Sequence, residues 1–179
     1  YFEDSKVNPI SYYGSSKWKS EQLFKQVSFP YSILRTVLIY GVNQDLTRSN
    51  IVLWAKAALE KGEEINVVYD QYRCPTLVED LAYACLRVIQ ENAIGVFHVS
   101  GKDFLSILDL VFEIADYWGL DKSLINSIST DRLNQKARRP LKTNLNLSKA
   151  KHAFNYQPKS FREGLKLLDE QINKIKLKE

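Results

Sequence analysis

Tyr13 and Lys17, four residues apart near the start of this 179-residue chain, could together carry out acid catalysis. On a helix, side chains at this spacing lie on one face, one turn apart. A lysine ammonium there would stabilise a tyrosinate, which makes the phenol a better proton donor to a carbonyl oxygen. The lysine could also hold the ribose hydroxyls of a nicotinamide cofactor. The pair therefore suggests carbonyl reduction, with hydride from the cofactor and the proton from Tyr13.

The spacing by itself is a weak signal, because the chain holds 10 tyrosines and many lysines. Such a pair also arises by chance, as an exposed tyrosine and lysine on a surface helix. The neighbouring Tyr12 would point about 100° away around the helix, so we do not expect it to share the role of Tyr13.

The residues around the pair favour the catalytic interpretation. The stretch "NPISYYGSSKWKSE" resembles the P-x-x-x-Y-G-x-S-K-x-x-x-E motif of extended short-chain dehydrogenases/reductases. Further matches follow in the family's order: "ILRTVLIYG", "YDQYRCPTLVEDLA", "GVFHVSG", "ARRPLKTNLNLSKAK" and "YQPKSFREGLK". The D-Q, P-T and D-L-A elements, with R-R-P, are similar to the dTDP-4-dehydrorhamnose reductase-like branch of that family. The resemblance covers essentially the whole chain.

This resemblance implies an NADP- or NAD-dependent reductase of a 4-keto nucleotide sugar, without a metal, and it allows a homodimer. Tyr13 would donate the proton, and Lys17 would assist it and bind the cofactor ribose. Arg73 and Gln71, with Arg139 from the basic pair Arg138–Arg139, would bind the substrate. For Arg73 a salt bridge to a nearby acid is the alternative, and for Arg139 simple exposure. Two other functions stay open: an epimerase or dehydratase of the same superfamily, and a non-catalytic regulatory subunit.

Arg35 and Thr36 lie in a run of residues that is otherwise apolar. Polar side chains on a buried strand need partners. We therefore expect these two residues either to line the cofactor side of the site or to be paired within the protein.

The expected fold is α/β: the C-terminal portion of a Rossmann-like NAD(P)-binding fold plus a small α/β substrate-binding region. No glycine-rich turn for a dinucleotide pyrophosphate occurs in the sequence. We therefore expect residues 1–62 to be the remainder of a cofactor-binding domain that includes the Tyr/Lys helix. Residues 63–179 would be mainly substrate-binding, with elements returning to the cofactor domain. As a fragment, the chain by itself is expected to be inactive.

Pattern and capping signals predict the elements that position these residues. Helices are expected over residues 10–27, 49–61 and 106–118, and from Ser160, which forms a capping box with Glu163. A second capping box is expected at Thr76 and Glu79, followed by a helix that buries Leu81, Cys85 and Val88. Strands are expected over residues 31–41, 65–70 and 95–101, and residues 124–156 look irregular.

Composition narrows the functional class. Hydrophobic residues make up 45% of the chain and the net charge is +4, without a basic stripe for nucleic acid or an apolar run long enough for a membrane helix. Two cysteines and two histidines predict neither a disulfide framework nor a zinc site. We expect a cytoplasmic protein, with His98 and the three tryptophans packed in the core, and Asp80 in a structural role at a helix start.

Overall fold

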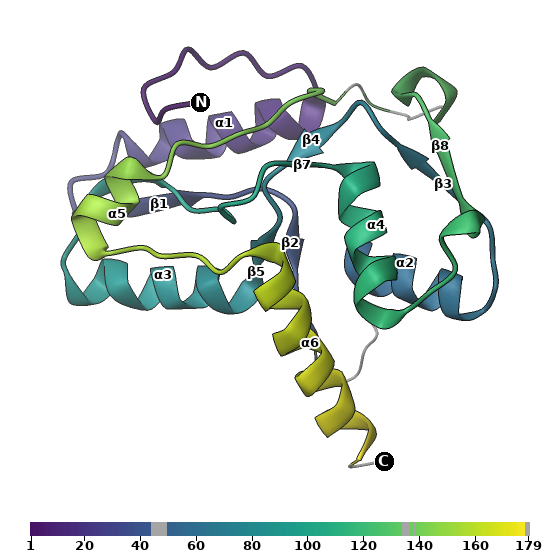
Figure 1. Ribbon diagram of the computed structural model, residues 1–179. Helices are drawn as coiled ribbons and strands as arrows, with labels where there is room; N and C mark the ends of the chain where they lie inside the picture. The colour runs from purple at the N-terminus through teal and green to yellow at the C-terminus, as the bar shows by residue number, and fades with distance from the viewer. Residues whose placement is uncertain (44–49, 134–136, 138, 178–179) are drawn as a thin grey trace.

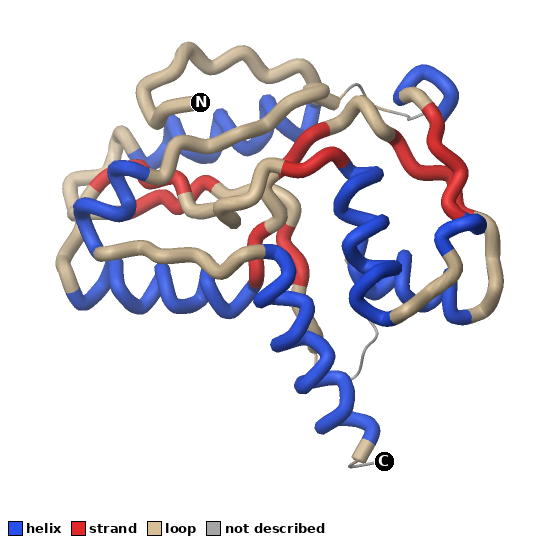
Figure 2. The backbone as a smooth tube through the Cα atoms, viewed as in Figure 1, coloured by secondary structure: helices blue, strands red, loops and turns tan. Residues whose placement is uncertain are grey.

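Helices and strands alternate along the chain, which confirms the α/β class (Figures 1 and 2). The computed structural model describes residues 1–43, 50–133, 137 and 139–177. The helices are α1 (Tyr12–Phe24), α2 (Ile51–Glu60), α3 (Val78–Gln90), α4 (Ile107–Trp118), α5 (Ser148–Phe154) and α6 (Phe161–Lys176), with the short 3-10 helices η1 (Lys122–Leu124) and η2 (Thr130–Leu133). The strands are β1 (Ser32–Arg35), β2 (Ile39–Tyr40), β3 (Ile65–Val68), β4 (Tyr72–Arg73), β5 (Thr76–Leu77), β6 (Gly95–His98), β7 (Leu105–Ser106) and β8 (Ile125–Ile128).

The described strands pair two by two. β1 pairs with β6, β2 with β5 and β3 with β8, all parallel, whereas β4 and β7 are antiparallel. In the first pair Arg35 lies opposite His98, at the carboxyl ends of both strands. α1 lies on one side of this pair and α3 on the other (Figure 1). α1 is therefore one outer layer of an α/β sandwich, beside the strand ends where such folds carry their binding sites.

Two clusters of buried apolar side chains stabilise the fold. The larger joins α2, β3, α4 and α6 and includes the fully buried Val52, Ile114 and Leu165. The smaller joins α3, β6 and α5, where the rings of Phe97 and Phe154 meet edge to face with centroids 5.3 Å apart. α1 contributes to neither cluster and buries none of its own residues. Contacts other than core packing must therefore hold α1 in place.

Local capping signals placed two helices correctly. The Ser106 hydroxyl accepts a hydrogen bond from the Asp109 backbone N–H at 2.9 Å at the start of α4, and Gly119 ends that helix with φ +64°. The predicted capping box of Ser160 and Glu163 is confirmed at the start of α6, with hydrogen bonds in both directions. Such ends are specified by a few neighbouring residues, so the sequence alone predicts them.

The single buried strand predicted over residues 31–41 is wrong in its middle. The chain forms β1, leaves the strand conformation, and resumes as β2 to pair with β5. Leu38 has a positive φ of 46° at this break. β1 is half-buried rather than fully buried. The apolar run was compatible with one long strand, but a residue with positive φ cannot continue a strand.

The capping box predicted for Thr76 and Glu79 is also wrong. α3 begins at Val78 after Leu77, without a side-chain cap. The Thr76 hydroxyl instead donates to the Val37 backbone oxygen at 2.6 Å, across the break between β1 and β2. Asp80, expected to be structural, is buried and accepts hydrogen bonds from the Lys159 backbone N–H and ammonium at 2.7 and 2.9 Å.

Burial at several helix positions differs from the prediction, although Val88 of α3 is buried as expected. α3 buries Ala84 and Val88, whereas Cys85 is exposed. Trp54 of α2 and Trp18 of α1 are 41% and 39% exposed, so these two tryptophans are not core residues as predicted. α2 packs through Val52, Ala55, Ala58 and Leu59.

The expected core position of His98 is confirmed, because its side chain is almost fully buried. Burial lowers the pKa of this imidazole, which favours its neutral form.

The segment predicted to be irregular contains a strand and an α-helix. Residues 125–128 form β8 beside β3, and residues 148–154 form α5. β6, from the second half of the chain, returns to pair with β1. The boundary expected at residue 62 stays a prediction.

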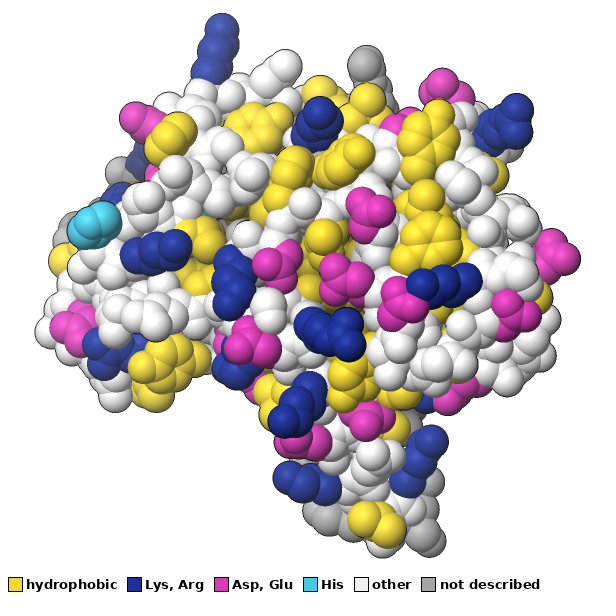
Figure 3. All heavy atoms as spheres, viewed as in Figure 1, with side chains coloured by type: hydrophobic (Ala, Val, Ile, Leu, Met, Phe, Trp, Pro, Cys, Tyr) yellow, Lys and Arg dark blue, Asp and Glu magenta, His cyan; other side chains and the backbone are white. Residues whose placement is uncertain are grey.

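α6 projects away from the other layers and ends near the C-terminus (Figure 1). On the face seen in Figure 3, lysines and arginines alternate with aspartates and glutamates around α4 and α6. Among the helices of the described ranges, none combines the length and the apolar composition needed to cross a bilayer.

Candidate active site

The first turn of α1 is fixed by the residues that precede it. The Ser11 hydroxyl caps the helix by accepting a hydrogen bond from the Gly14 N–H at 3.1 Å. Gly14 also lies close to Pro9, since a Cβ added there would approach the proline Cβ to 3.3 Å. Together these contacts place Tyr13 in the first turn of the helix and Lys17 one turn later.

Tyr13 and Lys17 lie side by side on the surface of α1. The Lys17 ammonium is 5.5 Å from the centroid of the Tyr13 ring, a cation–π distance. The Tyr13 side chain is 71% exposed, so its hydroxyl is accessible to a ligand. Of the ion pairs formed within the described part of the chain, none uses Lys17. An accessible phenol thus stands beside an ammonium that is free to interact with it.

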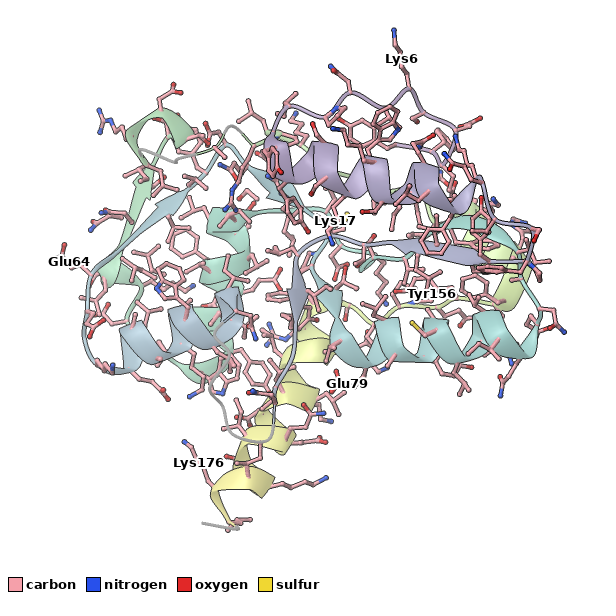
Figure 4. All side chains as sticks on the ribbon, turned by 180° about the vertical axis from the view of Figure 1, so that it is seen from behind. Lys6, Lys17, Glu64, Glu79, Tyr156 and Lys176 are labelled. Atoms are coloured by element: carbon pink, nitrogen blue, oxygen red, sulfur yellow. The ribbon has the colours of Figure 1, made fainter. Side chains whose placement is uncertain are left out.

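Both side chains line a groove of about 630 Å³ between α1 and β1, here called the strand groove. In Figure 4, Lys17 lies below α1, close to where the chain leaves β1. Other residues along this groove are Thr36, Val37, Thr143 and Leu145. Thr143 and Leu145 come from the segment that the sequence marked as irregular, and no motif there indicated that they would lie beside Tyr13.

A second groove of about 310 Å³, here called the loop groove, lies on another side of α1. The N-terminal residues 1–9 and the segment 140–145 form its other walls. Lys17 lines both grooves, and so do Glu21 and Arg35. These three residues therefore stand between the two hollows.

Arg35 ends β1 beside the strand groove, but its donors are engaged within the protein. Its Nε and Nη2 donate to the two carboxylate oxygens of Glu21 at 2.9 and 2.7 Å, and its Nη1 donates to the Glu3 backbone oxygen at 3.1 Å. The hydrogen bonds that Arg35 donates to the Glu21 carboxylate raise the pKa of Arg35. Of the two expectations for this residue, the structure therefore shows the paired arrangement, and cofactor contact stays a prediction.

Thr36 follows at the rim of the strand groove. Its hydroxyl donates to the Thr76 hydroxyl at 3.2 Å. Thr36 is half-buried and lies on the same groove as Lys17. Contact of Thr36 with the cofactor stays a prediction.

The predicted substrate residues lie around β4. Arg73 is 8% exposed and donates to the backbone oxygens of Tyr72, Pro140 and Leu141 at 2.7, 2.7 and 3.0 Å, and to the Gln71 side-chain oxygen at 3.2 Å. Burial lowers the pKa of Arg73, and the charge of the nearby Arg139 lowers it further. The salt bridge considered for Arg73 is absent from the described residues, and carbonyl oxygens take its place.

Arg139 is exposed next to this buried arginine. Arg138, its partner in the basic pair, lies outside the described residues. Gln71 is buried, and its amide donates to the Thr130 hydroxyl at 3.1 Å.

The catalytic and substrate sets are connected by one segment of chain. Pro140, whose carbonyl Arg73 holds, lines the loop groove together with Lys17 and Thr143. Residues 139–145 therefore run from the place where Arg73 and Arg139 lie to α1. The structure brings the predicted residues into one region, although they lie far apart in the sequence.

Comparison with known proteins identifies the family and the fold of the chain. A family model described as the RmlD substrate binding domain matches residues 1–173. The spore coat polysaccharide biosynthesis protein SpsK of Bacillus subtilis is 30% identical over 166 residues, covering 93% of this chain and 56% of that protein. Methionine adenosyltransferase 2 subunit beta of Xenopus tropicalis is 28% identical over 171 residues, covering 93% of this chain and 51% of that protein.

A solved structure also matches nearly the whole chain. The dTDP-4-dehydrorhamnose reductase of Bacillus anthracis, crystallised in complex with NADP, superposes with a TM-score of 0.88 at 29% identity. The match covers 96% of this chain and 59% of that one. The chain thus spans about half the length of the curated relatives it matches, and it has the fold of the corresponding part of the reductase.

Proposed function

This chain belongs to the RmlD substrate-binding domain family, and we propose on that footing that its full-length protein reduces a 4-keto nucleotide sugar with NADPH or NADH. The leading substrate is dTDP-4-dehydrorhamnose, which would be reduced to dTDP-rhamnose for cell-surface polysaccharide synthesis. Two relatives support this choice: a reductase named for that substrate and crystallised with NADP, and a polysaccharide biosynthesis protein.

The observation that carries the proposal is the placement of Tyr13 and Lys17 on one face of α1, with the ammonium 5.5 Å from the ring centroid. Tyr13 would donate a proton to the oxygen of the 4-keto group. Lys17 would provide a positive charge beside the phenolate that is left. When bound, the nicotinamide cofactor supplies the hydride.

The residues along the strand groove suit such a cofactor. Lys17 and the Tyr13 hydroxyl are polar groups that could hold ribose hydroxyls, and Thr36 adds a third. Val37 gives the groove an apolar wall, as small-molecule sites usually have. Arg35 is a weaker choice for contact with the cofactor, because Glu21 and Glu3 already engage its donors.

On the substrate side, we propose that Arg139 makes the direct contact with the diphosphate. Its side chain is exposed, and a guanidinium binds phosphate oxygens by charge-assisted hydrogen bonds. Arg73 and Gln71 would support this contact from the buried side of the site. Arg73 binds the carbonyls of Pro140 and Leu141, and so supports the segment that carries Arg139.

The test is the full-length protein assayed for NADPH or NADH oxidation with dTDP-4-dehydrorhamnose. Tyr13→Phe removes the proton donor and keeps the ring, and should lower kcat by about 100-fold or more, since general acid catalysis contributes about 10² to 10⁴. Tyr12→Phe is the matched control, because that side chain is 91% exposed and lies beside Tyr13 on the same turn. An unchanged kcat in Tyr13→Phe would remove this residue from the mechanism.

The second candidate is a regulatory subunit, favoured by the relative that is named as subunit beta of a methionine adenosyltransferase. This candidate predicts no cofactor oxidation with any nucleotide sugar by the wild-type protein. An epimerase or dehydratase would instead convert its substrate without net oxidation of added NAD(P)H, because its cofactor is regenerated in each cycle. Analysis of the products formed in the same assay distinguishes the three candidate functions: reductase, regulatory subunit, and epimerase or dehydratase.

A further inference from the structure

α1 carries the proposed catalytic pair, and within the described residues none of its side chains is buried or belongs to either apolar cluster. The strand groove and the loop groove lie on two of its sides. Its cap at Ser11 fixes the first turn. Within these residues, polar contacts of α1 must therefore set the direction in which Tyr13 and Lys17 point.

One pair of residues connects α1 to the strand beneath it. Glu21 accepts two hydrogen bonds from Arg35, at 2.9 and 2.7 Å, in the bidentate arrangement that fixes both distance and direction. The two side chains are 20% and 25% exposed, and both line the two grooves. The pair thus bridges from α1 to β1 between the two hollows.

Arg35 is itself held from two further sides. Its third donor binds the Glu3 backbone oxygen at 3.1 Å, and the Glu3 carboxylate accepts the His98 backbone N–H at 2.9 Å. His98 is the residue opposite Arg35 in the pairing of β1 with β6. The guanidinium therefore has a fixed position relative to both strands and to the segment that leads into α1.

Glu21 lies on the same side of α1 as the proposed catalytic pair. It follows Lys17 by four residues and Tyr13 by eight, and each step of four residues turns only about 40° around a helix axis. Anchoring Glu21 therefore anchors the direction in which Lys17 and Tyr13 point. An isolated, partly exposed ion pair adds little stability, so orientation is the effect that such a pair can provide here.

We propose that Arg35 and Glu21 are a positioning pair that sets the rotation of α1 and directs Tyr13 and Lys17 into the strand groove. The inference rests on the proposed function, because it assigns the pair a role in that reaction. The alternative is a direct contact between Arg35 and the cofactor. In that case Glu21 would have no role of its own in the reaction.

The test uses the full-length protein with Arg35→Gln, Glu21→Gln and the double variant. Each single variant should lower kcat about ten- to 100-fold, because misplacing a reacting group by about 1 Å has effects of this size. Because Lys17 also faces the cofactor, any change in the KM for NAD(P)H should be alike in the two single variants, and the double variant should be no slower than the slower single variant, as expected for coupled residues. Arg35→Lys, which keeps the charge but not the bidentate geometry, should recover part of the loss.

Arg87→Gln is the matched control. It breaks the ion pair between Arg87 of α3 and Glu91, the residue after that helix. The side chains of these two residues are 26% and 43% exposed. This variant should keep kcat and KM. An increased KM for NAD(P)H in the Arg35 variant alone, additive losses in the double variant, or an unchanged kcat would each overturn the positioning role.

Amide hydrogen exchange of α1 keeps the inference separate from the proposed function. Both single variants of the pair should accelerate exchange across residues 15–24 of the full-length protein, and Arg87→Gln should not. If the wild type shows no reductase activity, the proposed function fails. If amide exchange in α1 is the same in all variants, the proposal that Arg35 and Glu21 anchor this helix is wrong, whatever the reductase activity.

Discussion

Gly164 of α6 lies against the ring of Tyr40 from β2, and a side chain there has no room. A Cβ at this position would be 2.0 Å from the Tyr40 hydroxyl and 2.9 Å from the ring carbon that bears it. Tyr40 is almost fully buried and packs edge-on against Phe161 with ring centroids 5.2 Å apart. The ring therefore cannot move aside without disturbing the core.

We expect Gly164→Ala to lower the free energy of unfolding by about 1–3 kcal/mol, the usual cost of overpacking. Urea denaturation measures it, with Lys166→Ala as the control at an exposed position of the same helix. A gain in stability, as for glycine to alanine in an open helix, would contradict the close contact.

Glu163, at the start of α6, predicts a pH dependence. Hydrogen bonds from the Ser160 hydroxyl and backbone, and the nearby Lys102, lower the pKa of Glu163 from 4.5 to about 2. A carboxyl group whose pKa is lowered on folding stabilises the protein above the unfolded-state value, and this contribution is lost as the pH falls through the folded-state value. The capping box should therefore weaken between about pH 4.5 and about pH 2.

Glu163→Gln removes this titration and keeps the shape of the side chain. The stability difference between wild type and variant, from urea denaturation, should be larger near pH 7 than near pH 3. Glu170→Gln, which removes a carboxylate from the same helix outside the capping box, is the matched control. A difference that does not vary with pH would exclude the assigned role of Glu163.

At the scale of the elements, the break between β1 and β2 depends on Thr76. This residue is fully buried in β5, donates to the Val37 backbone oxygen at 2.6 Å and accepts from the Thr36 hydroxyl at 3.2 Å. Thr76→Val keeps the shape but leaves the Val37 carbonyl without this donor. We expect a loss of about 1–3 kcal/mol in the free energy of unfolding.

Thr36→Val is the comparison for this variant, because it removes only the longer of the two hydrogen bonds, from a half-buried residue. Its effect on chemical denaturation should be the smaller one. Equal losses in the two variants would show that the bond to Val37 is not what stabilises the break.

The sequence predicted those elements whose ends are marked by neighbouring residues. α4 and α6 carry their own caps at Ser106 and Ser160, so both were found. β8 was missed because its four residues include the polar Asn126 and Ser127, and only pairing with β3, far away in the sequence, makes it a strand. Thr76 was assigned to a cap because its spacing to Glu79 fits, whereas a distant carbonyl takes its hydroxyl.

The same limit applies to the candidate site. The motif around Tyr13 predicted α1, and the structure places Lys17 beside the ring. It could not predict that Arg73 would be buried against the carbonyls of Pro140 and Leu141, because those partners lie 67 and 68 residues away. Glu21 matched the motif, but its contact with Arg35 required the positions of α1 and β1 relative to one another.

At the scale of the whole molecule, the outer face of α3 exposes large apolar side chains. Tyr83, Leu86 and Ile89 are 53%, 50% and 73% exposed, and Ile94 beyond the helix is 63% exposed. Ile89 and Ile94 also border a groove of about 610 Å³ beside the start of β1. Apolar patches of this kind promote association.

We therefore expect the 179-residue chain, produced alone, to self-associate in a concentration-dependent manner, and Ile89→Lys to reduce this association. Sedimentation velocity measures both. Ser127→Lys adds the same charge at an exposed position of β8 and should leave association unchanged. A wild-type chain that stays monomeric at all concentrations would contradict the prediction.

The surroundings of α1 join segments that are synthesised far apart in time. β1 meets the end of the loop before β6 through Ser32 and Ala93, 61 residues apart, and Tyr1 contacts Asn144, 143 residues away. Contacts between residues so distant in sequence slow folding, because long loops must close first. The ribosome must therefore release the chain to beyond residue 144 before the walls of the loop groove can assemble. Until then the groove beside Lys17 has only part of its walls, and chaperones would meet α1 as an exposed segment.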